Sequence, residues 1–289
     1  MSVALAASAV LHEVEVRDAD ALGAVFAEAQ HEVVFHLAAQ IDVRYSVEHP
    51  AGDADANVLG AIAVLEAARA CGARRVVNTS TGGGLSGDAD VIPTPEDHPI
   101  RPLAPYGQAK YAAEGYCEPY TRLHDLATVS LRYGNVYGPR QDVHGEAGVV
   151  AIFCGCLIDN RTPTVFGDGR QTLDWIEVSD VVSANLLAAD SNLTGPINIG
   201  HGQETAVLEL IAALDEVSAG AMPEPPVRAR AAGRGPAKPP RCRTGQSRAG
   251  VGATRWATSR ARDNPRQTVK GRSQLIVSRS RTDDVCEPL

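Results

Sequence analysis

One tyrosine and one lysine have the residue types and the spacing to carry out acid–base chemistry on a hydroxyl group. Tyr106 and Lys110 are four residues apart in a segment with helical periodicity, so both side chains are expected on one helix face. Lys110 is the only lysine among residues 1–222, which contain eleven arginines. A compact ammonium near a phenol stabilises the phenolate and lowers the pKa of the phenol from about 10. Tyr106 is therefore predicted to act as a general base or acid.

A third candidate is the hydroxyl of Thr81, just beyond a β-branched run at 75–79. It could hydrogen-bond the same reacting oxygen as Tyr106. The alternative is that Tyr106 and Lys110 form an ordinary surface pair and that Thr81 is a turn residue. Ligands bind beyond the carboxyl ends of parallel strands, and the position of Thr81 at such an end favours the catalytic interpretation.

The elements that must position these side chains alternate along residues 1–222. Short β-branched runs predict strands, and apolar residues at intervals of three and four predict helices between them. Gly72 is expected to cap one helix, and Pro105 to lie in the first turn of another. The predicted strands are 33–37, 75–79, 128–132, 164–166 and 196–199, and the predicted helices are 18–29, 57–71, 105–124, 147–160, 180–189 and 205–219. This alternation indicates an α/β fold with a doubly wound, Rossmann-like parallel sheet covered on both faces.

Small residues follow three of the predicted strands, at 38–40, 80–84 and 133–140. Glycine and alanine allow a ligand to approach the backbone closely. Each segment taken alone would be an ordinary turn, whereas three of them at one edge of a sheet favour a cofactor site.

The composition argues against membrane, secreted and zinc-finger proteins. The chain has 289 residues, of which 44% are apolar and 21% charged, and no apolar run approaches the ~20 residues that span a bilayer. The first residues lack the basic segment of a signal peptide. None of the six cysteines has metal-ligand spacing. We expect reduced thiols, no metal site and a cytoplasmic location.

The charge divides the chain into two parts. Residues 1–222 carry 12 Lys and Arg against 30 Asp and Glu, whereas residues 223–289 carry 15 against 5. We expect a globular domain over 1–222, with substrate-binding segments within 138–222, and a basic, disordered tail over 223–289. The tail could bind nucleic acid or an anionic surface, but its Arg, Pro and Gly content favours out-of-frame translation of a GC-rich gene. Nucleic-acid binding is therefore not the favoured function.

The motifs around Tyr106 and Lys110 resemble those of extended short-chain dehydrogenases/reductases, and specifically the NAD-dependent epimerase/dehydratase family. The segments most similar to relatives of UDP-glucose 4-epimerase are VVFHLAAQ (33–40), NVLG (57–60), APYGQAK (104–110), LRYGNVYGPRQ (131–141) and FGDGRQTLDWIEVSDV (166–181). The likeness extends over about residues 14–219. It is specific for the family and leaves the sugar and the nucleotide open.

The resemblance implies NAD as cofactor, a nucleotide sugar (most simply a UDP-sugar) as substrate, and transient oxidation at the sugar C4. Tyr106 would be the catalytic base, Lys110 its electrostatic partner and Thr81 the hydroxyl that orients the substrate. The implied cofactor-binding residues are Glu15, Val16, Leu37, Ala38, Ala39, Gln40, Ile41, Asn57, Tyr106, Lys110 and Gly134, and the implied substrate-binding residues are Thr81, Asn135 and Arg140. A homodimer through the 57–71 and 105–124 helices is also implied. The alternatives are a 4,6-dehydratase or reductase of the same family, or a non-catalytic pseudoenzyme that binds a nucleotide sugar or a partner.

Four departures from the family pattern accompany this resemblance. The glycine-rich strand–turn–helix that holds the cofactor pyrophosphate is not found before residue 33. The fold is therefore expected to lack its first βαβ unit, and NAD binding is expected to be weak or absent. The family usually has Asp at Glu15, Arg at Leu173 and Tyr at Ser86. Leu173 cannot donate hydrogen bonds to a diphosphate as an arginine does.

Overall fold

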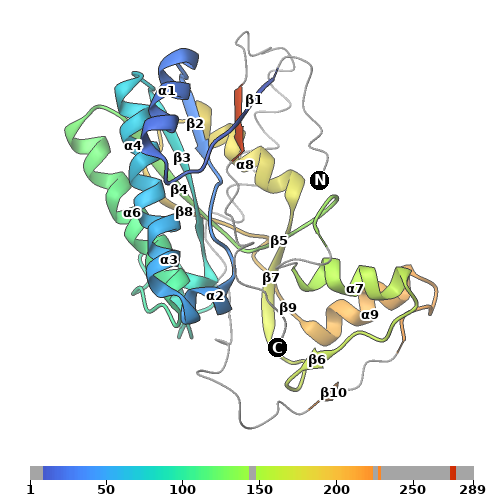
Figure 1. Cartoon of the computed structure of the whole chain (residues 1–289). Helices are drawn as coiled ribbons and strands as arrows, with labels where there is room; N and C mark the ends of the chain where they lie inside the picture. Colours follow the sequence, from blue (N-terminus) through green and yellow to red (C-terminus); the bar gives the residue numbers. More distant parts are fainter. Residues whose placement is uncertain (1–8, 143–147, 224–226, 229–273, 278–289) are drawn as a thin grey trace, which may run out of the picture.

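A four-stranded parallel sheet is the centre of the protein (Figure 1). The computed structural model describes residues 9–142, 148–223, 227–228 and 274–277. The sheet consists of β2 (Val33–His36), β3 (Arg75–Thr81), β4 (Ala127–Tyr133) and β8 (Gly195–Ile199) in the order β2-β3-β4-β8. All neighbouring strands are parallel, so their carboxyl ends meet at one edge.

Helices cover both faces of this sheet, which confirms the predicted Rossmann-like α/β fold. The helices α1 (Ala19–Ala29), α4 (Gly60–Ala70) and α6 (Pro105–Leu123) lie on one face, and α8 (Val178–Asp190) lies on the other (Figure 1). Successive side chains of a strand point to opposite faces. Val76 therefore packs in the core beneath α1 and α4, whereas Val77 packs in the core beneath α8.

The predicted caps are confirmed. Helix α4 ends at Ala70, and Gly72 adopts a positive φ of 76° two residues later, a conformation that glycine adopts at little cost. Pro105 is the first residue of α6. The helix predicted at 57–71 begins differently: α3 (Pro50–Ala54) leads through a π-helical turn, η1 (Asp55–Leu59), into α4. The short helices α2 (Val43–Glu48) and α3 lie before that turn and were not predicted.

A smaller layer follows β4. Its sheet has the order β5-β7-β9, with β5 (Asn135–Tyr137) parallel to β7 (Thr172–Glu177) and β9 (Glu204–Ala206) antiparallel to it. The helices α7 (Val149–Ile158) and α9 (Val207–Val217) and the strand β6 (Val165–Phe166) enclose a separate apolar core around Phe153. The buried carboxylate of Asp174 accepts the backbone N–H groups of His201 at 2.8 Å and Gly202 at 3.0 Å. Asp174 thereby ties β7 to the loop after β8.

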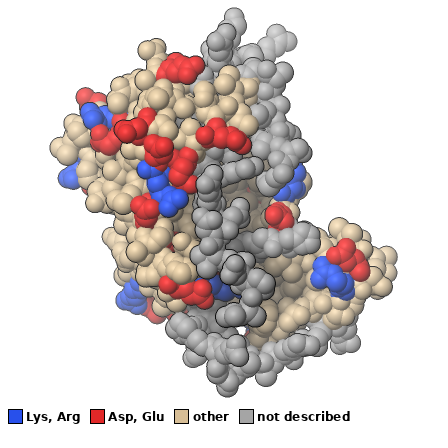
Figure 2. All heavy atoms as spheres, in the orientation of Figure 1, with Lys and Arg blue, Asp and Glu red and all other residues tan. Residues whose placement is uncertain are grey.

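Most of the predicted basic tail lies outside the described residues. Two short segments within it are described: β11 (Gln274–Val277) pairs with β1 (Val10–Glu13), and β10 (Val227–Arg228) pairs with β6. On the face shown in Figure 2, the coloured part of the surface carries many Asp and Glu side chains. Within the described ranges, no helix has both the length and the apolar character needed to cross a membrane.

Candidate active site

Three loops meet at the carboxyl edge of the parallel sheet, as the sequence predicted. Ala38–Gln40 follow β2, Gly82–Gly84 follow β3, and Gly134 follows β4. The register pairs His36 with Asn78 and Thr81 with Tyr133, so the loops lie next to one another. Residues far apart in the sequence therefore form one continuous edge.

Helix α6 begins directly against the loop that follows Thr81. A Cβ added at Gly107 would lie 2.1 Å from the backbone oxygen of Gly84, so only glycine permits this close approach. The Thr81 hydroxyl oxygen accepts a hydrogen bond from the Gly84 N–H at 3.3 Å. Because Tyr106 is in the first turn of α6, the close approach at Gly107 brings that turn to the strand end that carries Thr81.

Lys110 is buried, with 4% of its surface exposed, one turn further along α6. Its ammonium donates a hydrogen bond to the backbone oxygen of Thr79 at 3.1 Å. Burial lowers the pKa of Lys110 to about 8, while the nearby carboxylates of Asp53 and Glu114 act in the opposite direction. Tyr106 and Lys110 belong to one helix at this edge, as the four-residue spacing predicted.

A buried polar network lies beside Lys110. The amide side chain of Asn57 accepts from the Gln40 N–H at 3.0 Å and donates to the Gln40 backbone oxygen at 2.9 Å. The side chains of Gln40 and Asn57 both donate to one carboxylate oxygen of Asp53, at 2.8 and 2.9 Å. The sequence predicted Gln40 and Asn57 as cofactor contacts but missed Asp53. The spacing of Asp53 and Asn57, four apart in a helical segment, was the signal that could have found it.

The other predicted cofactor residues lie around this network. Leu37 and Ile41 are 59% and 58% exposed, and Ala38 and Ala39, which follow Leu37, are half-buried. Val16 is buried against Gly60, one helical turn beyond Asn57. The Glu15 carboxylate accepts from the Arg17 guanidinium at 3.2 Å.

One predicted cofactor residue, Gly134, and two predicted substrate residues, Asn135 and Arg140, lie beyond β4. The Gly134 N–H donates to the Ile199 backbone oxygen at 2.9 Å, and a Cβ added there would lie 2.8 Å from the backbone oxygen of Asp174. Asn135 is half-buried and pairs in register with Trp175 of β7. Arg140 is exposed beyond the end of β5, with a positive φ of 71°.

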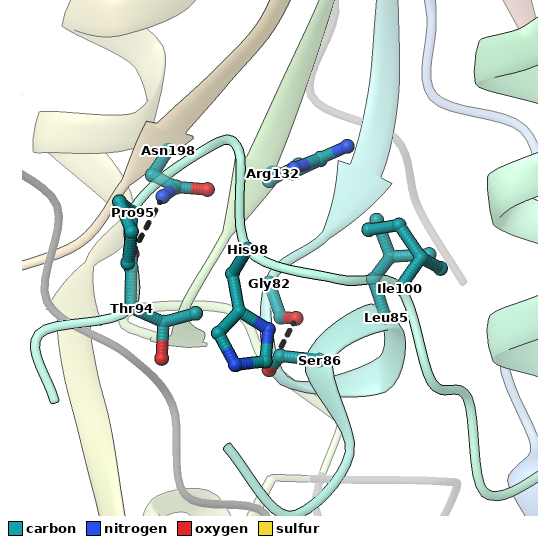
Figure 3. Close-up of a pocket in the computed structure, with 9 residues that line it drawn as sticks. All are labelled: Gly82, Leu85, Ser86, Thr94, Pro95, His98, Ile100, Arg132 and Asn198. Carbon is teal, nitrogen blue, oxygen red and sulfur yellow. Dashed lines mark hydrogen bonds between the residues drawn. The ribbon is translucent and has the colours of Figure 1, made fainter. Parts of the chain in front are cut away.

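Two cavities lie near this edge without enclosing the predicted catalytic residues. The smaller cavity has a volume of about 20 Å³, room for about one water molecule. Its lining includes Gly82, Ser86, Thr94, His98 and Asn198 (Figure 3). The Ser86 hydroxyl there donates to the Gly82 backbone oxygen at 3.3 Å. A cavity of about 740 Å³ lies between α6 and the strands β4 and β8, and Tyr106, Lys110 and Thr81 are not among its lining residues. The candidate site is therefore the open carboxyl edge of the sheet.

A parallel sheet covered by helices on both faces, with a tyrosine and a lysine one turn apart at its carboxyl edge, is a Rossmann-like α/β architecture. The chain belongs to the NAD dependent epimerase/dehydratase family, whose sequence model matches residues 2–200. The UDP-glucose 4-epimerase of Mycolicibacterium smegmatis is 47% identical over 201 residues, which are 69% of this chain and 64% of that enzyme. A Methanocaldococcus jannaschii relative is 49% identical over 179 residues, 62% of this chain and 58% of that protein. The chain thus spans less than two thirds of the length of these two relatives.

Solved structures show the same relationship. The UDP-glucose 4-epimerase of Thermotoga maritima, solved with UDP-glucose, has a TM-score of 0.76 and 41% identity over 79% of this chain and 74% of that one. The UDP-glucose 4-epimerase of Thermus thermophilus, in complex with NAD, has a TM-score of 0.71 and 40% identity over 76% of this chain and 72% of that one.

Proposed function

We propose that the chain is an NAD-dependent epimerase that inverts C4 of the sugar in a UDP-sugar such as UDP-glucose. The observation that carries this proposal is the placement of Tyr106 and Lys110 on α6, against the strand end that carries Thr81. The UDP-glucose and NAD complexes of the two similar epimerases support the choice of substrate and cofactor.

The residues at the sheet edge fit the proposed cofactor. Leu37 and Ile41 present exposed apolar side chains that an aromatic ring system can cover. The Lys110 ammonium has three donors and bonds to one acceptor in the described part of the chain, so it can reach a ribose hydroxyl. The two hydrogen bonds from the Asn57 side chain fix the backbone of Gln40, the residue that precedes Ile41. Bound NAD⁺ supplies the acceptor and donor of the hydride that leaves and returns to the sugar carbon.

In the proposed reaction the phenolate of Tyr106 takes the proton of the sugar 4-hydroxyl. The positive charge of Lys110, one turn along the helix, stabilises that phenolate. The Thr81 hydroxyl holds the reacting oxygen in place for the proton transfer. The 4-keto sugar then rotates so that its opposite face is presented for reduction. Tyr106 returns the proton to the C4 oxygen, which becomes the new hydroxyl.

The nucleotide part of the substrate has fewer candidate partners in this chain than the proposed cofactor has. Asn135 at the start of β5 and Arg140 beyond its end are our candidates for the diphosphate sugar. Leu173, in β7 opposite Thr205 of β9, adds no donor. We therefore expect weaker substrate binding than a second arginine at this position would give.

Replacement of Tyr106 tests the proposal. Tyr106→Phe should reduce interconversion of UDP-glucose and UDP-galactose by about 10²–10⁴-fold with an unchanged circular dichroism spectrum. Tyr111→Phe is the matched control, because Tyr111 is on the same helix and exposed. Retained activity in Tyr106→Phe would show that the base is misassigned. A 4-keto-6-deoxy product would instead identify a dehydratase, and NAD and UDP binding without turnover a pseudoenzyme.

We also propose a homodimer through α4 and α6 and a cytoplasmic location. The two helices pack together on one side of the sheet (Figure 1), and Leu59, Tyr116 and Leu123 of this layer are 57%, 45% and 71% exposed. Ala113 of α6 is buried within the chain, with 2% of its surface exposed, so it does not belong to this exposed surface. The four described cysteines are free thiols, which suits a reducing compartment. Light scattering of the full chain tests the dimer, and a monomeric mass would overturn it.

A further inference from the structure

Asp53 is the most completely buried acid near the candidate site. It lies in α3 with none of its surface exposed. One carboxylate oxygen accepts the two amide hydrogen bonds from Gln40 and Asn57. The other oxygen is buried and has no hydrogen-bond partner among the described residues. An unpaired buried acceptor is costly, so a favourable interaction must offset it.

Lys110 is the cation whose charge acts on the pKa of the Asp53 carboxyl. Helix α3 packs against α6, and burial raises the pKa of the Asp53 carboxyl while the two amides and Lys110 lower it. The Lys110 ammonium is buried and its one described hydrogen bond is to Thr79. The two groups therefore have opposite charges, unused hydrogen-bonding capacity and a common interface.

Other charged or titratable groups near Lys110 are already engaged or neutral. Glu114, also on α6, gives both carboxylate oxygens to the Arg132 guanidinium at 2.7–3.2 Å. His36, buried at the end of β2, has its pKa lowered to about 3 by burial and by Lys110, so its ring is neutral at pH 7. Asp53 is thus the acid facing Lys110 that is not neutralised by another cation.

We propose that Asp53 is a positioning residue whose carboxylate is the counter-ion of Lys110, keeping its buried ammonium charged and fixed behind Tyr106. Gln40 and Asn57 hold the carboxylate in place through the oxygen they share, and its negative charge acts on Lys110 across the contact between α3 and α6. An ammonium buried without such a charge would lose its proton more readily. The catalytic consequence rests on the proposed function, whereas the charge pairing does not.

The ionisation of Lys110 can be observed directly. The chain has three lysines, at 110, 238 and 270, so carbon NMR of ε-¹³C-lysine protein gives few signals, and Lys110→Arg assigns the one of interest. We expect Asp53→Asn to lower the Lys110 midpoint by about 1–3 pH units, the effect of a nearby opposite charge. Asp55→Asn is the matched control: this exposed acid in the next turn pairs with Arg17 and should leave the midpoint unchanged. An unchanged midpoint in Asp53→Asn would refute the proposal.

A double-mutant cycle provides a second readout should Asp53→Asn fold poorly. Asp53→Asn and Lys110→Met are compared singly and together by urea denaturation. If the two charges stabilise each other, Asp53→Asn should cost less stability in the Lys110→Met background than alone, and Lys110→Met should restore folding to an unfolded Asp53→Asn. Additive losses would show that Asp53 acts on the fold without Lys110.

The activity profile separates this inference from the proposed function. If the wild type interconverts UDP-sugars, the alkaline limb of its rate profile should move to lower pH in Asp53→Asn by the shift that NMR measures, because Lys110 then loses its proton earlier. A fall in rate without such a shift would refute the positioning role. If the wild type has no activity, the proposed function fails, and the NMR midpoint and the mutant cycle still decide whether Asp53 and Lys110 are paired.

Discussion

Removing one partner of the ion pair between Glu114 and Arg132 should be among the most destabilising single substitutions in the described structure. The guanidinium contacts the carboxylate through Nε at 2.9 and 3.2 Å and through Nη2 at 2.7 Å, and both side chains are only 7% exposed. The third nitrogen, Nη1, donates to the backbone oxygen of Glu96 at 2.9 Å. Arg132 thereby joins α6, β4 and the loop before α6.

Glu114→Gln removes the charge and places an amide N–H₂ where a carboxylate oxygen now accepts. Arg132 is left buried without a counter-charge, a change that costs about 3–5 kcal/mol. With an m-value of about 2 kcal/mol per molar urea, the unfolding midpoint should fall by about 1.5–2.5 M. Circular dichroism during urea titration measures this fall.

A control variant on the same helix and a double variant of the same ion pair test this reasoning. Glu118→Gln removes an exposed acid 3.9 Å from Arg122, with side chains 72% and 66% exposed, and should change stability by less than about 0.5 kcal/mol. Replacing both Glu114 and Arg132 by methionine should cost less than Glu114→Gln, because no unpaired charge remains. If Glu114→Gln costs no more than Glu118→Gln, burial of the pair has been overestimated and the reasoning is wrong.

Two further predictions concern the site itself. Gly107→Ala should abolish activity and destabilise the chain by about 1–3 kcal/mol, because the added Cβ would meet the Gly84 backbone oxygen. Gly115→Ala is the control, because Gly115 is on the same helix and has open space around it. Thermal melts should show that this control is neutral or stabilises the chain by up to about 1 kcal/mol. The pKa of His36 is about 3 in the folded chain, below the ~6.5 of an unfolded chain. The neutral His36 ring therefore contributes its full share of the free energy of unfolding above pH 6.5. This share is lost as the pH falls toward 3, and the loss is about 2 kcal/mol at pH 5. His36→Leu should remove that part of the pH dependence of urea midpoints, and an unaltered slope would contradict the buried neutral ring.

Local patterns predicted the parallel sheet and most of its helices because each carries its own signal. The β-branched runs at β3 and β4 fall within one or two residues of the observed strands, and Gly72 and Pro105 mark helix ends by backbone constraints that act within a few residues. The spacing of Tyr106 and Lys110 predicted a shared helix for the same reason. The strands β5 and β9 were missed because each has only three residues. The strand β7 has six residues but pairs with partners far along the chain, which no local pattern reveals.

The network around Asp53 could not be predicted from local pattern. Residues 49–55 read HPAGDAD, a polar segment that is typical of a solvent-exposed turn. Asp53 is buried in the folded chain, where α3 packs on α6, the helix that carries Lys110. The π-helical turn at Asp55–Leu59 was also not predictable, because a π-helical turn has no residue types that distinguish it from an α-helical turn. Such turns are frequent at functional sites, and this one carries Asn57.

Most of the buried charged side chains lie along one edge of this fold, and Arg75 at the start of β3 is the exception among the described residues. Lys110, Asp53, Asp174 and the Glu114–Arg132 pair all lie within or next to the segments at the carboxyl ends of the strands. Burying charges costs folding free energy even when they are paired, and apolar replacements of similar volume are often neutral or stabilising. A fold selected for stability alone would therefore place apolar residues at these positions. Their presence in a chain that otherwise builds its cores from Val, Leu, Ile and Ala is what the proposed reaction would require of this edge. It is there that stabilising substitutions should most often abolish the proposed activity.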